Sequence, residues 1–169
     1  MPGCGKTFLG KYAANKLGVD FVDLDEVISK EQSLSISEIF RIKGEEEFRN
    51  LELIALKNLI GEIKQDTIIA TGGGTPCYNN AMEVMNDAGI TVWLDVDIAQ
   101  LIVNIQAENA IRPLFNDPNN GSLEDKLGKM YQLRRPFYDK SEVKVAVNRG
   151  LSPDLFTNHL HLSTFAKYH

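Results

Sequence analysis

The sequence predicts an α/β fold of three layers, in which helices cover both faces of a central parallel sheet. Short apolar runs alternate with longer amphipathic segments, which is typical of strands joined by helices. A glycine-rich turn stands directly before the first amphipathic segment. The length of 169 residues suits one domain, and 43% hydrophobic with 24% charged residues excludes a disordered or collagen-like chain. We therefore expect one domain over residues 1–169.

The glycine-rich turn opens the chain. Gly3 and the run Gly5-Lys6-Thr7 match the closing half of the pattern G-x-x-x-x-G-K-[ST], whose backbone N–H groups hold phosphates. Residues 8–18 follow with helical spacing, so the dipole of this helix would add to an anion site. In this pattern the lysine reaches the β- and γ-phosphates, and the Thr7 hydroxyl binds Mg²⁺. The turn therefore predicts an ATP site made by Gly3, Cys4, Gly5, Lys6 and Thr7.

The strand that normally precedes such a turn is missing from the sequence. Counting back from Gly5, the first glycine of the pattern falls one position before Met1. In a parallel sheet that strand is usually central, so its absence would open the core. We expect the natural polypeptide to extend upstream by one strand, roughly 5–8 residues.

The first half of the chain then continues with strands and helices in turn. The apolar run at residues 19–27 is broken by Asp23 and Asp25, as at a strand end. A capping box in Ser35–Phe40 predicts a short helix, which Gly44 interrupts. Residues 45–63 predict a longer helix, with apolar side chains at Phe48, Leu51, Ile54, Ala55, Leu59 and Ile63. Residues 66–71 predict a buried strand that runs into three glycines.

The second half repeats the alternation. It predicts a short helix over residues 79–88, a strand over 91–96 and a helix from Asp97 through Ile105. Residues 108–121 contain two prolines, four asparagines and a glycine, and loops of this length are often lids. A helix over 122–138, a strand over 144–148 and a last helix opened by Ser152-Pro153 complete the order.

Composition indicates which classes of binding partner are excluded. The net charge of −5 argues against a nucleic-acid-binding protein, and no apolar run approaches the roughly 20 residues that span a bilayer. Two cysteines, Cys4 and Cys77, make no disulfide framework and no four-ligand zinc site, which suits a reducing compartment. We therefore expect a cytoplasmic protein without nucleic-acid or membrane partners. We also expect a monomer, although composition does not determine the oligomeric state.

Five features in their order resemble the shikimate kinase family of P-loop kinases, over residues 3 to about 149. They are GCGKT, the pair Asp23 and Asp25, FRNLE around Arg49, the glycines 72–74, and RPL followed by RRPFY. The resemblance implies a P-loop kinase fold with a substrate-binding insert over about residues 25–60 and a mobile lid over about 107–122. It also implies transfer of the ATP γ-phosphoryl group, with Mg²⁺, to the 3-hydroxyl of shikimate in aromatic amino-acid biosynthesis.

The resemblance also implies the catalytic residues, namely Lys6, Asp25 and Arg112. Asp25 matches the aspartate that binds shikimate and takes or orients the proton of the attacking hydroxyl, and a carboxylate at a strand end is where ligands gather in α/β sheets. The alternative for Asp25 is a helix cap. Asp23 matches the aspartate that helps Thr7 hold Mg²⁺. Arg112 matches the lid arginine that closes over the transferred phosphate, with a solvated loop arginine as the alternative.

The remaining roles concern shikimate and adenine. Shikimate has a carboxylate, so its site needs a planar, bidentate cation. Arg49 and Arg134 match the two family arginines that bind this carboxylate. Glu52 matches the acid that holds Arg49 in place across one helical turn. The alternative for Arg49 is a surface ion pair with Glu45–Glu47. The triple glycine offers backbone N–H groups and a close approach for substrate. The residues matched are Gly72, Gly73 and Gly74, the aromatic rings of Phe40 and Phe48, and Arg149 at the adenine side.

Two positions depart from the family pattern, and two other functions remain open. Ile105 stands where the family often stacks an arginine on adenine, and Cys4 replaces a small serine or alanine, where a thiol beside Lys6 and a helix N-terminus is expected to be oxidation-prone. A gluconate or other small-polyol kinase shares the same scheme, but the paired arginines with the triple glycine favour shikimate. A binding protein without catalysis is disfavoured by four retained residues, namely Lys6, Thr7, Asp25 and Arg112.

Overall fold

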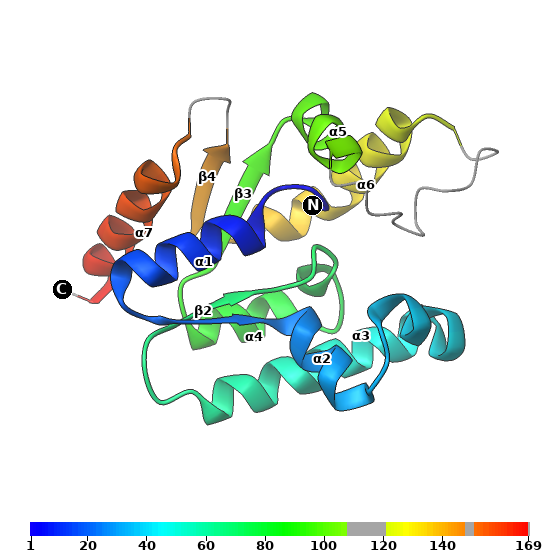
Figure 1. Ribbon diagram of the computed structural model, residues 1–169, viewed down its shortest axis with the longest axis horizontal. Helices are drawn as coiled ribbons and strands as arrows, with labels where there is room; N and C mark the ends of the chain where they lie inside the picture. Colours follow the sequence, from blue (N-terminus) through cyan, green and yellow to red (C-terminus); the bar gives the residue numbers. More distant parts are fainter. Residues whose placement is uncertain (108–120, 148–150, 169) are drawn as a thin grey trace.

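The computed structural model describes residues 1–107, 121–147 and 151–168 (Figure 1). Helices and strands alternate along this part of the chain, close to the predicted order. The strands are β1 (Asp20–Asp23), β2 (Thr67–Ala70), β3 (Val92–Val96) and β4 (Val143–Val147). The helices are α1 (Lys6–Leu17), α2 (Leu24–Gln32), α3 (Ile36–Glu62), the 3₁₀ turn η1 (Thr75–Cys77), α4 (Ala81–Ala88), α5 (Ile98–Ala107), α6 (Leu123–Tyr138) and α7 (Pro153–Tyr168).

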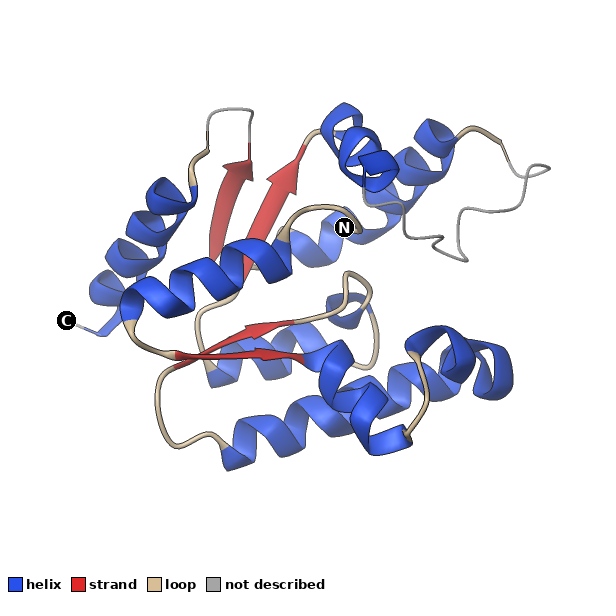
Figure 2. Cartoon of the chain, in the orientation of Figure 1, coloured by secondary structure: helices blue, strands red, loops and turns tan. Residues whose placement is uncertain are grey.

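The strands form two parallel pairs. β1 pairs with β2 from Asp20↔Thr67 to Asp23↔Ala70, and β3 pairs with β4 from Val92↔Val143 to Val96↔Val147. Where a single central sheet was predicted, the described residues show these two pairs with no pairing between them, and Figure 2 shows the pairs running in different directions. Because β1 and β2 are parallel, both end at the same edge, which brings the residues after Asp23 beside the glycines after Ala70.

Helix α1 packs against β1, β2 and α7 (Figure 1). It begins after Gly5 and stops before Gly18, and both glycines have left-handed backbone angles, with φ of 84° and 70°. A Cβ on Gly10 would lie 2.6 Å from the ring of Phe21, so the missing side chain lets this helix approach β1 closely. The start of α1 is thereby fixed near the carboxyl end of β1.

Apolar side chains gather in two clusters. One joins the N-terminal loop and α1 to β3, β4 and α5–α7, with Leu101 and Leu127 fully buried. The other lies among α2, α3 and α4 and has Leu24, Ile28 and Ile39 at its centre. No helix within the described ranges is both long and apolar enough to cross a membrane. The second cluster anchors α3, the helix that carries Arg49.

Helix α3 confirms the predicted start and break. Ser35 and Glu38 form the capping box, and Gly44 has non-helical angles (φ 81°, ψ 173°) that kink the helix between its two segments. The predicted apolar face is only partly right. Ile54 is 55% exposed, whereas Glu52 is 2% exposed. The buried face of α3 therefore carries charge as well as apolar groups, and this is where the candidate site lies.

Candidate active site

Thr7, Asp23 and Asp25 meet where β1 ends and α1 begins. The Thr7 hydroxyl donates to Oδ2 of Asp23 at 2.9 Å, and the other carboxylate oxygen of Asp23 accepts from the backbone N–H of Asp25 at 3.1 Å. Asp23 is therefore the N-cap of α2, which corrects the alternative that made Asp25 the cap. The Asp25 side chain is left for another role.

Asp25 lies in the first turn of α2, half-buried and beside the glycine loop. A Cβ on Gly72 would stand 3.4 Å from Oδ1 of Asp25, so this carboxylate faces the loop after β2. Burial raises the pKa of Asp25 above its ordinary value, and the charges of Asp23 and Glu52 raise it further, while Lys6 and Arg49 act in the opposite direction. The carboxylate thus sits between anionic and cationic neighbours, which favours a proton-transfer role.

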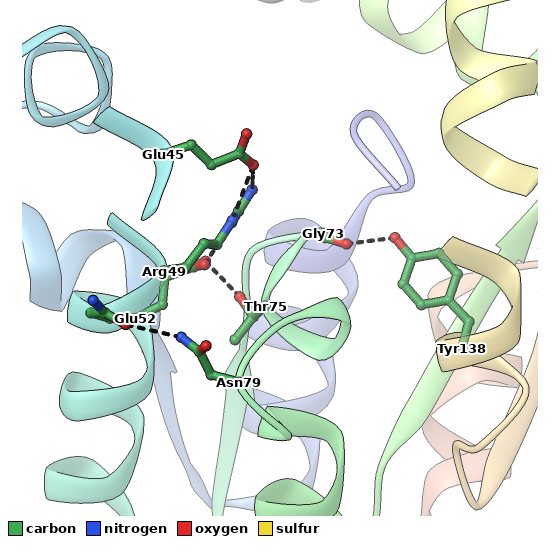
Figure 3. A network of polar contacts seen from close by, with 8 residues as sticks. Glu45, Arg49, Glu52, Gly73, Thr75, Asn79 and Tyr138 are labelled. Carbon is green, nitrogen blue, oxygen red and sulfur yellow. Dashed lines mark hydrogen bonds and ion pairs between the residues drawn. The ribbon is translucent and has the colours of Figure 1, made fainter. Parts of the chain in front are cut away.

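Arg49 projects from α3 into a set of acidic partners (Figure 3). Its Nη1 lies 2.5 Å from Oε2 of Glu52, and its Nη2 and Nε lie 2.9 and 3.3 Å from Oε1 of Glu45. Burial acts to lower the pKa of Arg49, but the two ion pairs outweigh it and the pKa is raised. The predicted pair with Glu52 and the alternative pair with Glu45 are both present, and the guanidinium is only 8% exposed.

Aromatic rings surround the same guanidinium. Its Cζ lies 4.6 Å from the ring centroid of Tyr78, 5.2 Å from that of Phe48 and 5.6 Å from that of Phe40. These rings replace water around the cation and contribute cation–π attraction. Phe40 and Phe48, predicted beside the substrate, thus lie next to Arg49 and contact each other at 4.3 Å between centroids.

The triple glycine leaves room for charged side chains. A Cβ on Gly72 would lie 2.7 Å from Oε1 of Glu52, one on Gly73 would lie 3.3 Å from Nη1 of Arg134, and one on Gly74 would lie 2.6 Å from Nη2 of Arg49. None of the three has a positive φ. The loop therefore needs glycine for space and not for its backbone angles, and both predicted arginines reach it.

Tyr138 joins the glycine loop to α6. Its phenol donates to the carbonyl oxygen of Gly73 at 2.6 Å (Figure 3), and its side chain is 5% exposed. Burial raises the pKa of Tyr138, and the nearby Arg134 acts against this rise. Because Arg134 and Tyr138 stand one turn apart on α6, this hydrogen bond fixes the distance between the arginine and the loop.

The N-terminal turn lies against α5. Gly3 and Gly5 have φ of 71° and 84°, and the amide of Asn104 donates to the carbonyl of Gly3 at 2.7 Å. A Cβ on Gly3 would lie 2.9 Å from Cγ1 of Ile105, so this isoleucine packs on the turn. Cys4 is 3% exposed, and this burial disfavours the predicted reaction of its thiol with external oxidants.

Most predicted site residues converge on one region. These are Lys6, Thr7, Asp23, Asp25, Arg49, Gly72, Gly73, Gly74 and Arg134. Residues 108–120, which make up most of the predicted lid and include Arg112, lie outside the described residues, as does Arg149. Thr75, Tyr78 and Tyr138 were missed, although Thr75 directly follows the glycines, Tyr78 stands three positions after Thr75, and Tyr138 ends the RRPFY segment. Their roles depend on contacts that sequence spacing does not reveal.

Comparisons with known proteins agree on one family. A model of the shikimate kinase family matches residues 2–163. A shikimate kinase of Phocaeicola vulgatus is 37% identical over 142 residues, which cover 83% of this chain and 79% of that protein. A shikimate kinase of Alkaliphilus oremlandii is 39% identical over 145 residues, 85% of this chain and 83% of its own length.

Solved structures give the same result for the fold. The shikimate kinase from Acinetobacter baumannii in complex with shikimate has a TM-score of 0.85 and 30% identity, with 99% of this chain and 92% of that chain covered. The shikimate kinase from Bacteroides thetaiotaomicron also has a TM-score of 0.85, with 31% identity and coverages of 98% and 93%. These similarities confirm the predicted α/β fold of the P-loop kinase type.

Proposed function

Because the chain belongs to the shikimate kinase family, we propose that its active site is the region between the start of α1, Asp25 and Arg49. The function is that of the family: an ATP-dependent kinase that converts shikimate to shikimate 3-phosphate and ADP. Membership of this family excludes the two alternatives considered from the sequence, a polyol kinase and a binding protein without catalysis. The proposal concerns which residues perform each part of the reaction.

The observation that carries the proposal is the buried, doubly paired Arg49. A guanidinium has five N–H donors, and the bonds to Glu45 and Glu52 described above use three of them. One donor remains on each terminal nitrogen for a carboxylate, whose two oxygens suit paired N–H groups. Arg134 reaches Gly73 from α6 and supplies a second cation. We assign the shikimate carboxylate to these two arginines and the shikimate ring to the glycine loop.

Asp25 is the group assigned to the attacking hydroxyl. The reaction needs a carboxylate that accepts or orients the proton of the 3-hydroxyl while its oxygen attacks the γ-phosphorus. The raised pKa of Asp25 makes this carboxylate more basic than an exposed aspartate. We assign Lys6, whose charge acts on Asp25, to stabilise the negative charge of the transferred group.

The start of α1 is the proposed phosphate site. The N-cap Gly5 has no side chain that bonds to the first turn, so the N–H groups of this turn could donate to phosphate oxygens. Cys4 and Gly3 complete the turn, and Lys6 supplies its charge. We retain Arg112 for the transferred phosphate and Arg149 for the adenine side, as the resemblance implies.

Thr7 and Asp23 fit a magnesium ion that also binds phosphate oxygens. Their oxygen atoms lie 2.9 Å apart, next to the proposed phosphate site. Mg²⁺ usually takes one or two protein oxygens and fills its remaining positions with water and phosphate oxygens, which agrees with this small donor set. When bound, the ion would neutralise phosphate charge. In the described residues no group of three or more His, Cys, Asp or Glu side chains is placed to hold a metal ion.

We also propose that the chain forms one domain and that the enzyme acts as a monomer in the cytoplasm. The residues assigned to shikimate and to phosphate come from a single chain. Cys4 and Cys77 are both free thiols, as expected in a reducing compartment.

Carboxylate recognition is tested by comparing shikimate with its methyl ester, which lacks the negative charge. The wild-type enzyme should bind the ester much more weakly in calorimetry. Arg49→Ala and Arg134→Ala should each lower the affinity for shikimate by roughly tenfold or more, the scale of one charged hydrogen bond. The affinity of each variant for the methyl ester should change little from that of the wild type. If either variant still prefers shikimate to the same degree, that arginine does not bind the carboxylate.

A further inference from the structure

Thr75 is a buried polar residue for which the proposed mechanism has no role so far. It directly follows Gly74 and opens η1, and its side chain is 1% exposed. Its hydroxyl donates to Oε1 of Glu52 at 2.7 Å (Figure 3). Its backbone N–H donates to the carbonyl of Gly72 at 3.2 Å, which closes the turn after β2. The backbone of the loop therefore holds the Thr75 hydroxyl against Glu52.

Glu52 divides its two oxygens between Thr75 and Arg49. Oε1 accepts from Thr75, and Oε2 lies 2.5 Å from Nη1 of Arg49. Glu52 is 2% exposed, and a buried carboxylate is costly unless its oxygens are hydrogen-bonded. The hydroxyl of Thr75 satisfies one oxygen and turns the other toward Arg49. The geometry of the Arg49 guanidinium thus depends on a residue 23 positions beyond Glu52 in the sequence.

We propose that Thr75 is a positioning residue for shikimate, which acts through Glu52 to hold Arg49 in the orientation that binds the substrate carboxylate. This inference rests on the proposed function, because it requires Arg49 to bind that carboxylate. Gly74 supports it, because the absent side chain lets Arg49 lie against the same turn that Thr75 anchors. A valine at position 75 would keep the shape of threonine and lose only the hydroxyl, which makes the role testable.

The test compares Thr75→Val with Thr75→Ser in steady-state assays of ADP release. Thr75→Val should raise the KM for shikimate by roughly tenfold, the scale of one hydrogen bond to a charged group, with a smaller effect on kcat and none on the KM for ATP. Thr75→Ser keeps the donor and should restore the KM for shikimate. Thr157→Val is the matched control, because Thr157 is also buried and donates to Pro153 within α7. It should leave the KM for shikimate unchanged.

A double-mutant cycle separates this inference from the proposed function. In an Arg49→Ala background, Thr75→Val should cause no further loss of shikimate affinity, because its effect passes through Arg49. An equal loss in both backgrounds, or an unchanged KM in Thr75→Val, would overturn the inference and leave the Arg49 assignment intact. An unchanged affinity in Arg49→Ala alone would instead overturn the proposed function. If Thr75→Val does not fold, Thr75→Ala removes the same hydroxyl and is judged by the same outcomes.

Discussion

Gly74 and Arg49 lie so close that a methyl group on the glycine would stand 2.6 Å from Nη2 of the guanidinium and 2.8 Å from its Cζ. The backbone of Gly74 has φ −92° and ψ −23°, which alanine adopts without strain. The only demand for glycine at this position is therefore the space that Arg49 occupies. Gly74 thus makes room for the arginine that we assign to the shikimate carboxylate.

Gly74→Ala should displace Arg49 and raise the KM for shikimate by about tenfold or more, because overpacking a close contact costs about 1–3 kcal/mol. The matched control is Gly61→Ala in α3, where an added Cβ meets nothing within 4 Å. Alanine there should stabilise the helix by about 0.5–1 kcal/mol and leave the KM unchanged. Kinetics and thermal unfolding measure both effects, and an unchanged KM in Gly74→Ala would show that Arg49 can move without cost.

Asp25→Asn should lower turnover by roughly 10²–10⁴-fold, the range for lost general acid–base catalysis. The amide keeps the size of the side chain but cannot accept the proton of the attacking hydroxyl. Measuring kcat with the enzyme saturated by both ATP and shikimate separates turnover from binding. Near-normal turnover in this variant would remove Asp25 from the proton-transfer step.

The raised pKa of Asp25 predicts the acidic limb of the pH–rate profile. The carboxylate must be ionised to accept the proton, so kcat/KM should fall as the pH falls through this pKa. The limb should lie above the value of about 3.9 for an ordinary aspartate. It should be absent from the residual activity of Asp25→Asn. A limb at the ordinary aspartate value would contradict the environment described for this residue.

The same pKa predicts an effect on stability. Because the pKa of Asp25 is higher in the folded than in the unfolded protein, ionised Asp25 destabilises the fold at neutral pH, and this cost disappears below the unfolded pKa. Asp25→Asn should therefore melt at a higher temperature than the wild type at neutral pH, and the difference should shrink as the pH is lowered. Equal melting temperatures at all pH values would argue against the raised pKa.

The local features of the fold were predictable because the residues that form them are neighbours in the chain. The capping box of Ser35 and Glu38 and the break at Gly44 lie where the sequence predicts them. The Arg49–Glu52 pair, which the family resemblance implies, agrees with helical spacing, since partners three positions apart lie on one face. The division of the strands into two pairs was not predicted as such.

The contacts that complete the site could not be predicted in this way. Thr75 meets Glu52 across 23 residues, and Tyr138 meets Gly73 across 65. Such pairs depend on how β2, α3 and α6 pack, which a single sequence does not specify. The triple glycine could be recognised in the sequence, but the reason for it could not. The side chains that occupy the space beside these glycines come from α3 and α6, which are distant in the sequence.

The most direct test of the account is the rate of ADP release from ATP by the purified protein with shikimate, with gluconate and with neither. Membership of the shikimate kinase family, with the shikimate ring assigned to the glycine loop, predicts rapid release from ATP with shikimate and not with gluconate or with neither acid. The residue assignments also predict that each of Arg49→Ala, Arg134→Ala and Asp25→Asn reduces this rate at limiting shikimate. Equal release with gluconate, or release that depends on neither hydroxy acid, would contradict this prediction.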